Sequence, residues 1–329
     1  MKTILKSLQG MLTAALLIAC AATAHARSWR INNDATKKPH FADINAAMSS
    51  SDVVAGDTLY LDPGCNLTAN QAVTKKVNII GTGYFLAGNV HQPATIGGSS
   101  FNLKAEGIKV EGCMVTATTV FYSNNITLER CRLQKVTYSG TAQNAIVRQC
   151  YITDQVIGAS ATSTNTSGWT IENCIILLTS WNPIDYLYMP VIRNNYIKTT
   201  LNESVAIARV SGGTITDNIL AYGSSQSTAY WEVKDCAVSN NVFVSQKDFS
   251  EDAVFALTGS NDERYRLKDD SPAKGAATNG GDCGPFDGRY PYVCSGFPLG
   301  MPRFASSTVP TRPEDGQLRV TQTVALQGE

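Results

Sequence analysis

Two side chains in the middle of the chain have the types that acid–base chemistry needs. Asp185 lies in the stretch NPIDYLY, and Arg209 lies 24 residues later in SVAIARV. A carboxylate can accept a proton from a carbon atom, and a guanidinium can offset the negative charge that develops beside it. Surface ion pairs of these two residue types are far commoner than catalytic pairs. Asp185 and Arg209 are therefore a candidate catalytic pair, with a plain ion pair as the alternative.

Aromatic side chains lie in the same stretch as Asp185 and in comparable stretches elsewhere in the chain. They suggest a second kind of interaction, which is stacking against sugar rings. Aromatic faces flanked by hydrogen-bonding groups are suited to holding a glycan. In a strand, alternate side chains point to opposite faces, so part of such a set would fill a core instead. The candidate substrate-binding residues are Tyr122, Trp181, Tyr186, Tyr188, Tyr230, Trp231 and Glu232.

Histidine is too scarce to support a mechanism in the centre of the chain. The three histidines, His25, His40 and His91, all lie in the N-terminal part. This argues against a Ser-His-Asp triad or a histidine-bound metal, and no acidic cluster has the spacing of calcium ligands. The chain has 27 basic and 27 acidic residues without long blocks of one sign. The sequence therefore predicts no metal site, no evident cofactor and no nucleic-acid partner.

Seven segments of the chain share one pattern. Each has alternating apolar residues, a polar pair or turn, then Cys or Asn, and then a second short apolar run, as in TIENCIILL around Cys174. The marked Cys or Asn positions lie 18 to 24 residues apart, with a mean of about 21. These positions are Cys113, Cys131, Cys150, Cys174, Asn195, Asn218 and Asn241.

The period of two inside each segment indicates strands rather than helices. A unit of about 21 residues with three short strands and three turns makes one coil of a parallel β-helix, which buries its apolar face by stacking on its neighbours. Leucine-rich repeats have a similar period but need a leucine-rich consensus, which is absent. The sequence therefore predicts an all-β solenoid. Phe41, Ile44, Ala47 and Met48, at helical spacing, predict a short helix that caps its N-terminal end.

The repeat also favours a structural role for the marked residues. Side chains in register would stack about 4.8 Å apart, with cysteines packed inward as small apolar groups and asparagine amides forming a hydrogen-bonded ladder. Disulfides between adjacent coils and a reactive or metal-binding thiol are the alternatives, although no Cys-x-x-Cys or Cys-His pattern is present. Cys283 and Cys294 lie 11 residues apart in a loop rich in Gly and Pro and form a candidate local disulfide.

The two ends of the chain differ from the repeat. Residues 1–26 have a basic start, a short apolar core and the cleavage pattern AHA, which predict a secretory signal peptide. The stretch LIAC, which ends at Cys20, resembles a bacterial lipobox, so a lipid anchor through Cys20 is the alternative. No later stretch approaches 18 consecutive apolar residues, so no transmembrane segment is expected. We expect a β-helix domain over residues 27–305, a linker and terminal strand over 306–329, and a secreted, periplasmic or outer-surface location.

Several stretches together resemble one known group of proteins. They are FADINAAM with AGDTLYL, VNIIGTGYFL, the coils ending in Asn-Asn, and YRLKDDSPAKGAA followed by DCGPFDGRYPYV. Over roughly residues 29–300, the chain is similar to secreted bacterial proteins of the pectin-lyase-like superfamily, particularly those of Bacteroidetes. The resemblance implies a right-handed parallel β-helix with an irregular closing segment near its C-terminus. It does not decide the function, because the superfamily includes lyases, glycoside hydrolases, adhesins and binding proteins.

The resemblance also implies where a site would lie. In this superfamily the binding groove usually follows the strands that precede the turn before the marked ladder, and the candidate residues above map to that face. A lyase would need a base, a groove and a cation such as Ca²⁺, but the Arg-x-Pro-x-x-Arg motif of pectate lyases and the polygalacturonase-like motifs are missing. We therefore expect a protein that binds polysaccharide or cell-surface glycan without evident catalysis. A divergent polysaccharide lyase or glycoside hydrolase, and a structural or adhesive surface protein, are the alternatives.

Overall fold

The computed structural model describes most of the chain. The described residues are 26–86, 92–178, 181–259, 261–297, 302–308 and 321–326, the last two segments by their backbone alone. The predicted signal peptide up to His25, the lipobox cysteine Cys20 and His91 lie outside the described residues.

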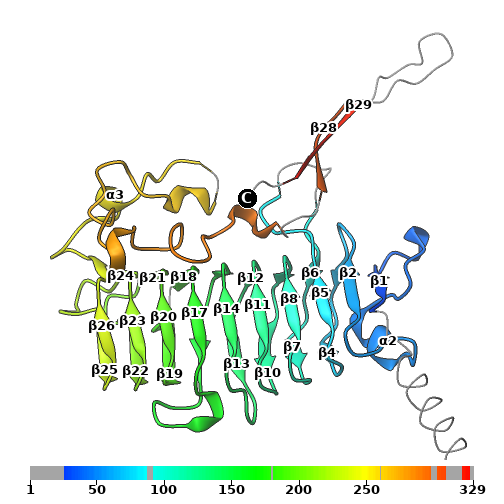
Figure 1. Ribbon diagram of the computed structural model, residues 1–329, viewed down its shortest axis with the longest axis horizontal. Helices are drawn as coiled ribbons and strands as arrows, with labels where there is room; N and C mark the ends of the chain where they lie inside the picture. The colour runs from blue at the N-terminus through cyan, green and yellow to red at the C-terminus, as the bar shows by residue number, and fades with distance from the viewer. Residues whose placement is uncertain are drawn as a thin grey trace, which may run out of the picture.

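The chain winds into a long solenoid with three faces, each of which is a parallel sheet (Figure 1). Each complete coil gives one strand to sheet A, the next to sheet B and the third to sheet C, and successive coils pair in parallel. Crossovers between parallel strands of one sheet are right-handed. The predicted fold class, an all-β right-handed parallel β-helix, is confirmed.

Sheet A contains β1 (Ser28–Ile31), β2 (Thr58–Leu61), β5 (Asn78–Ile80), β8 (Lys109–Glu111), β11 (Thr127–Glu129), β14 (Ile146–Arg148), β17 (Thr170–Glu172), β20 (Val191–Arg193), β23 (Thr214–Thr216) and β26 (Ala237–Ser239). Sheet B contains β3 (Asn66–Leu67), β6 (Thr95–Ile96), β9 (Met114–Val115), β12 (Arg132–Leu133), β15 (Tyr151–Ile152), β18 (Ile175–Leu178), β21 (Tyr196–Thr199), β24 (Ile219–Ala221) and β27 (Val242–Val244). Sheet C contains β4 (Gln71–Val73), β7 (Ser100–Leu103), β10 (Thr118–Phe121), β13 (Val136–Tyr138), β16 (Val156–Ile157), β19 (Ile184–Tyr188), β22 (Ile207–Ser211) and β25 (Tyr230–Lys234).

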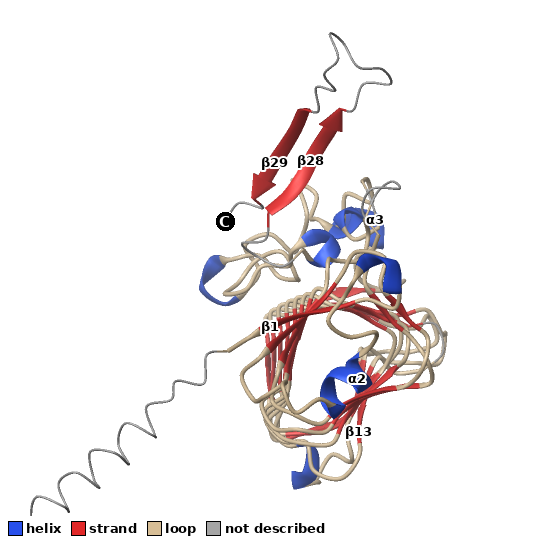
Figure 2. Cartoon of the chain, turned by 90° about the vertical axis from the view of Figure 1, so that its right-hand side faces the viewer, coloured by secondary structure: helices blue, strands red, loops and turns tan. Residues whose placement is uncertain are grey.

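The helices are short and lie outside the sheets. Helix α2 (Ile44–Ser49) covers the N-terminal end of the solenoid (Figure 2), where it buries Ile44, Ala47 and Met48. It begins at Asp43, whose carboxylate accepts a hydrogen bond from the backbone N–H of Ala46 at 2.7 Å. The other helical segments of the described residues are α3 (Glu251–Val254) and the 3-10 turns Ala35–Lys37, Thr164–Thr166, Glu263–Tyr265, Thr278–Gly280 and Cys294–Gly296.

The interior is filled by rows of aliphatic side chains that run along the solenoid axis. One row on sheet A has one inward-pointing residue from each of six successive coils, and each is fully buried. Because successive coils lie at the inter-strand spacing, each residue of a row touches the next, and the rows form one continuous core. This row consists of Val110, Leu128, Val147, Ile171, Ile192 and Ile215.

The marked positions stack at the corner between sheets A and B. Cys131, Cys150 and Cys174 are buried free thiols that donate to backbone carbonyls. Further along, the side-chain amide of Asn195 donates to Asn218 at 2.9 Å, and that of Asn218 donates to Asn241 at 2.9 Å. Cys113 continues the row as another buried free thiol.

The residue before each marked position has a left-handed backbone, with φ between 51° and 64°. This conformation turns the chain sharply from one sheet into the next, and it costs little for Gly and least among other residues for Asn and Asp. The residues are Gly112, Arg130, Gln149, Asn173, Asn194, Asp217 and Asn240.

A segment near the C-terminus, residues 276–297, runs back along this corner; we call it the strap. It can be followed in Figure 1 as the orange chain above the strands. The left-handed residues hold it: Asp217 accepts from the backbone N–H of Thr278 at 2.7 Å, the Asn173 amide donates to the Asp287 carbonyl at 2.6 Å, and that of Gln149 donates to the Pro291 carbonyl at 2.6 Å. The predicted closing segment is therefore a strap that binds the corner of several coils.

The strap corrects the expectation of a local disulfide. Cys283 and Cys294 are both free thiols. The Cys283 thiol donates to the carbonyl of Asn240 at 3.0 Å, while the Cys294 sulfur accepts from Arg266 at 3.6 Å. The two cysteines thus contact different parts of the molecule, because the strap between them is extended along the coils rather than folded into a local loop.

The two described strands beyond the strap lie outside the three solenoid sheets. Strands β28 (Pro302–Thr308) and β29 (Thr321–Leu326) pair with each other, antiparallel. The expected linker over the first residues after 305 is therefore partly a strand, and the terminal strand pairs with it instead of docking on a coil. Within the described residues, no helix is long and apolar enough to cross a membrane.

Candidate functional site

Asp185 and Arg209 lie in neighbouring strands of sheet C and form an ion pair. The guanidinium Nε of Arg209 donates to Asp185 Oδ1 at 2.8 Å, and Nη2 donates to Oδ2. Asp185 is buried, with 2% of its surface exposed, while Arg209 is partly exposed. The hydrogen bond to Asp185 raises the pKa of Arg209 above its ordinary value, so the guanidinium stays charged.

The same guanidinium contacts two aromatic rings. Its central carbon lies 3.9 Å from the ring centre of Tyr186, on the preceding coil, and 4.8 Å from that of Trp231, on the following coil. Planar guanidinium groups stack well on aromatic faces. Arg209 therefore fixes the position of both rings, and the Trp231 side chain remains half exposed.

An unusual backbone conformation brings these residues to one face. Tyr186, Arg209 and Glu232 are in register in β19, β22 and β25, and each has a left-handed φ of 58°, 48° and 50°. Because this conformation interrupts the alternation of the strand, Ile184 and Leu187 are both core residues while Asp185 and Tyr186 both lie outside the core. Three strained residues in register cost of order 1–3 kcal/mol each, and such strain is concentrated at functional sites.

The structure brings together part of the predicted set. Asp185, Tyr186, Arg209 and Trp231 form the cluster just described, and Glu232 is exposed beside it, where its charge also acts on Arg209. We call these five residues the sheet C cluster. The cluster contains one positively charged side chain, Arg209, and two negatively charged ones, Asp185 and Glu232.

Tyr230 was predicted to bind substrate, but its side chain points into the core. Its ring packs against the core and meets Phe243 edge-on at 6.0 Å. Burial raises its pKa well above the ordinary value, and its hydroxyl has no hydrogen-bond partner among the described residues. Tyr230 alternates inward because Trp231, the next residue in the strand, points outward.

Three other candidates lie around the cluster rather than in it. Tyr188 ends β19 and is partly exposed. Trp181 precedes β19 and is 66% exposed. Tyr122 follows β10, three strands from β19, so it is about 14 Å away along the axis. It is 41% exposed and faces Lys104 at 5.5 Å. These aromatics extend the exposed surface of sheet C without touching Arg209.

A loop that the sequence reading missed borders the cluster. Residues 158–168 connect β16 to β17, and the Ser211 hydroxyl donates to the carbonyl of Ala161 in this loop. The backbone N–H of Gly168 donates to the Tyr188 carbonyl at 3.1 Å. The loop projects beyond the other turns of sheet C (Figure 1) and so forms a wall at one side of the site. Its only sequence signal is a polar run, SATSTNTSG, between two coils.

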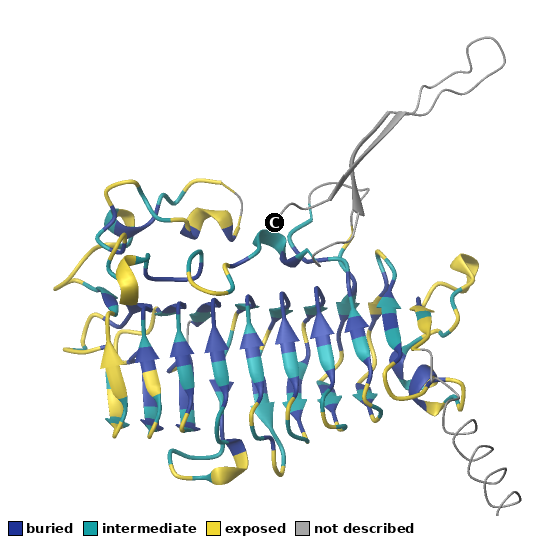
Figure 3. Ribbon diagram, viewed as in Figure 1, coloured by how far each residue is buried: buried dark blue, intermediate teal, exposed yellow. Residues whose placement is uncertain are grey.

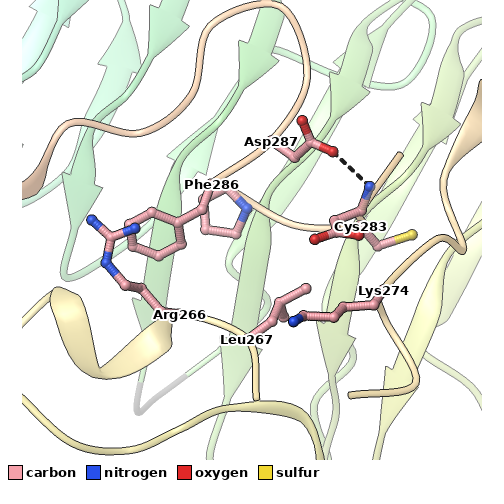
Figure 4. Close-up of a pocket in the computed structure, with 8 residues that line it drawn as sticks. Arg266, Leu267, Lys274, Cys283, Phe286 and Asp287 are labelled. Atoms are coloured by element: carbon pink, nitrogen blue, oxygen red, sulfur yellow. Dashed lines mark hydrogen bonds between the residues drawn. The ribbon is translucent and has the colours of Figure 1, made fainter. Parts of the chain in front are cut away.

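A pocket of about 260 Å³ lies elsewhere, on the strap side of the molecule (Figure 4). Its lining includes Arg266, Lys274 and Asp287. Their charges are already engaged: Arg266 stacks on Phe286, Lys274 pairs with Asp269, and Asp287 accepts from the backbone N–H of Asp282. Asp282, the fourth charged residue of the lining, accepts a hydrogen bond from the backbone N–H of Gly275. Each charged side chain of the pocket thus contacts another group of the protein, and we place the candidate site on sheet C.

The described residues include no group of three His, Cys, Asp or Glu side chains arranged to hold a metal ion. Asp185 and Arg209 in the sheet C cluster instead bind each other. The cluster can present aromatic faces and hydrogen-bonding groups on an open surface, which suits a chain-like ligand better than a small molecule.

Comparison with a family model agrees with the fold. A family model described as a right-handed β-helix region matches residues 93–243. This chain carries a right-handed β-helix region. A solved structure of a pectin methylesterase variant with a bound hexasaccharide is similar, with 10% identity over 77% of this chain and 96% of that chain, at a TM-score of 0.29. No curated protein matches the sequence. The β-helix region contains the strands that carry all five residues of the sheet C cluster.

Proposed function

We propose that this protein binds polysaccharide on the outer face of sheet C and does not turn it over. The observation that carries the proposal is the stack of Tyr186, Arg209 and Trp231, in which a charged guanidinium holds two aromatic rings in place. A ring that is already fixed loses little entropy on binding, so a sugar can stack on the exposed face of Trp231 at low cost.

The charges of the cluster indicate which glycans it suits. Both oxygens of Asp185 already accept from Arg209, so the only free charge in the cluster is the exposed carboxylate of Glu232. An anionic polymer would meet a negative group without a free cation to offset it. The proposed ligand class is therefore neutral polysaccharide, with hydrogen bonds to hydroxyl groups supplied by the polar residues of the face.

The same pair supports binding over catalysis. Both carboxylate oxygens of Asp185 accept charge-assisted hydrogen bonds from Arg209, so neither is aimed at a substrate. One observation favours the second candidate, a divergent lyase or glycosidase: the strained residues in register lie at this position. In that case Asp185 would act as the base after Arg209 had moved.

A glycan panel tests the proposal. Neutral and acidic polysaccharides are titrated calorimetrically, while unsaturated products and reducing ends are measured in parallel. We expect binding to a neutral polymer, no turnover, and at least tenfold weaker binding in Trp231→Ala. Phe249→Ala is the matched control, because Phe249 is 46% exposed but pairs with β27 in sheet B, outside sheet C. Turnover that is lost in Asp185→Asn would establish the enzyme instead, and binding unaffected by Trp231→Ala would place the glycan elsewhere.

We also propose that the protein reaches its ligand outside the cytoplasm, through the signal peptide predicted in residues 1–26. Mass spectrometry of the protein purified from its own cells tests this. A mature chain that begins at Arg27 is expected, and a lipid-modified Cys20 would establish the anchored form instead. An intact N-terminus in a cytoplasmic fraction would overturn export.

A further inference from the structure

Within the part of the chain that the structure describes, the C-terminal end of the solenoid is open. Three inward-pointing residues of the last coil, Val233, Val238 and Phe243, are in register with Val210, Ile215 and Leu220 one coil earlier. The earlier three are fully buried, whereas Val238 is 44% exposed and the other two are partly exposed. In Figure 3 this end stands out as exposed strands beside buried ones. The core row of the interior therefore continues to the surface.

The open edge is concentrated on β26. Every residue of β26 is exposed, whereas Val242 and Val244 in β27 are buried, and the chain returns at Phe249 to form a bridge with Val244. The opposite end of the solenoid is covered by α2. Proteins normally cover such edges or place charges in them, because unpaired strand edges recruit other strands. The inward position of β26 instead holds a valine.

We infer that two copies of this chain join through their C-terminal coils, with β26 of one copy pairing antiparallel with β26 of the other. A twofold axis perpendicular to the solenoid axis makes the strand of the second copy run antiparallel to that of the first. Side chains that point inward in one copy also point inward in the other. Val238 then faces its own counterpart, and the two cores become one. The inference stands apart from the proposed function, because the sheet C cluster is not needed for it.

Three features favour a second copy as the occupant. A second copy presents the same unpaired β26 edge, which another protein would have to reproduce. The edge of the last coil also exposes Val238 where the preceding coil buries Ile215, so a second copy would cover an apolar row with the same row. Its exposed charges include both signs, with Lys234 next to Asp235, so two equal ends do not repel strongly. Because α2 covers the other end, the assembly stops at two copies and does not grow into a fibre.

The molar mass in solution, measured by sedimentation over a concentration series, tests this. The full-length chain is expected to have twice the mass of one chain, and Val238→Lys the mass of one. Val54→Lys is the matched control, since Val54 is 42% exposed but lies near α2 at the opposite end; it is expected to remain a dimer. Thermal unfolding shows whether each variant is folded.

A charge-swap experiment makes the test specific to the proposed axis. Val238→Asp alone is expected to be a monomer, and mixing it with Val238→Lys is expected to restore a dimer of one copy of each, since the two charges then face each other. A monomeric wild-type chain overturns the inference. So does a dimer that survives in Val238→Lys. Protection of the β26 amides from hydrogen exchange in a monomer would show that the chain covers its own end, which also overturns it.

Discussion

Arg209 donates two hydrogen bonds to Asp185, and this pair organises the outer face of sheet C. The Asp185 side chain is 3% exposed and that of Arg209 is 22% exposed. Because water hardly reaches the carboxylate, the guanidinium must offset its negative charge. The guanidinium in turn lies against the rings of Tyr186 and Trp231. One ion pair thus links the stability of the strands to the shape of the candidate binding surface.

Replacing Arg209 with alanine is expected to destabilise the protein. A carboxylate left buried without its partner costs about 3–5 kcal/mol when fully enclosed, and we expect about 2–3 kcal/mol here because Arg209 is partly exposed. Urea unfolding of the single variants and of Arg209→Ala with Asp185→Ala measures the coupling between the two. The double variant should recover part of the loss, because the buried charge is gone.

A matched pair elsewhere in the chain provides the control. Arg30 and Asp62 also form a two-pronged pair, with an Nη2–Oδ2 distance of 2.6 Å, but the Arg30 side chain is 48% exposed. Arg30→Ala should therefore change the free energy of unfolding much less. Equal losses in both variants would show that burial of Asp185 is unimportant.

Tyr230→Phe tests the inward placement of Tyr230. The Tyr230 hydroxyl is buried without a hydrogen-bond partner among the described residues, and an unsatisfied buried polar group costs about 1–3 kcal/mol. Removing the hydroxyl is expected to raise the free energy of unfolding by about 1 kcal/mol and to leave glycan binding unchanged. Weaker glycan binding would place the hydroxyl in the site after all.

The sequence was sufficient to predict the solenoid and the face that carries the candidate site. The recurring Cys or Asn positions mark the corner between sheets A and B, and the period-two pattern around them identifies the strands. From that register, Asp185, Arg209 and Trp231 could be assigned to neighbouring coils. The sequence predicts which way a side chain points only where inward and outward residues alternate regularly. It could not tell which of Tyr230 and Trp231 points into the core, because it does not show which residues of β25 face inward.

Two features could not be predicted for physical reasons. The left-handed backbone at Tyr186, Arg209 and Glu232 falls on residues that have no intrinsic preference for it, so the surrounding coils must impose it. The strap depends on contacts between residues more than a hundred positions apart, such as Asn173 with Asp287. Local patterns around Cys283 and Cys294 suggested a closed loop because they carry no information about those distant contacts.

The row of hydrogen-bonded asparagines, Asn195, Asn218 and Asn241, should contribute to the stability of the protein. Asn218 accepts from the backbone and side-chain amides of Asn195 and donates to Asn241 and to the Ile192 carbonyl. Asn218→Ala leaves several of these buried groups unsatisfied, and we expect a loss of about 3 kcal/mol in urea unfolding. Asn202→Ala, at an exposed turn, should have little effect and serves as the control. A small loss at Asn218 would mean that water replaces the missing amide.

Asp262 is expected to give the protein a stability that depends on pH. It is fully buried beneath the strap, where its Oδ2 accepts from the backbone N–H of Ser295 at 2.6 Å and from the Tyr292 hydroxyl at 3.0 Å. The Tyr292 hydroxyl also shares a hydrogen bond with Tyr84, which anchors the strap to an early coil. Burial outweighs the hydrogen bonds and raises the pKa of Asp262 above its ordinary value.

Because the native state binds this proton more tightly than the unfolded state, the contribution of Asp262 is fully present below the unfolded pKa of about 3.9. It is lost as the pH rises through the raised native pKa, with a slope of at most about 1.4 kcal/mol per pH unit. Urea unfolding of the wild type and of Asp262→Asn between about pH 4 and pH 7 measures this. The wild type should lose stability relative to the variant as the pH rises. A difference between the two that stays constant over this range would show that Asp262 has an ordinary pKa in the folded protein.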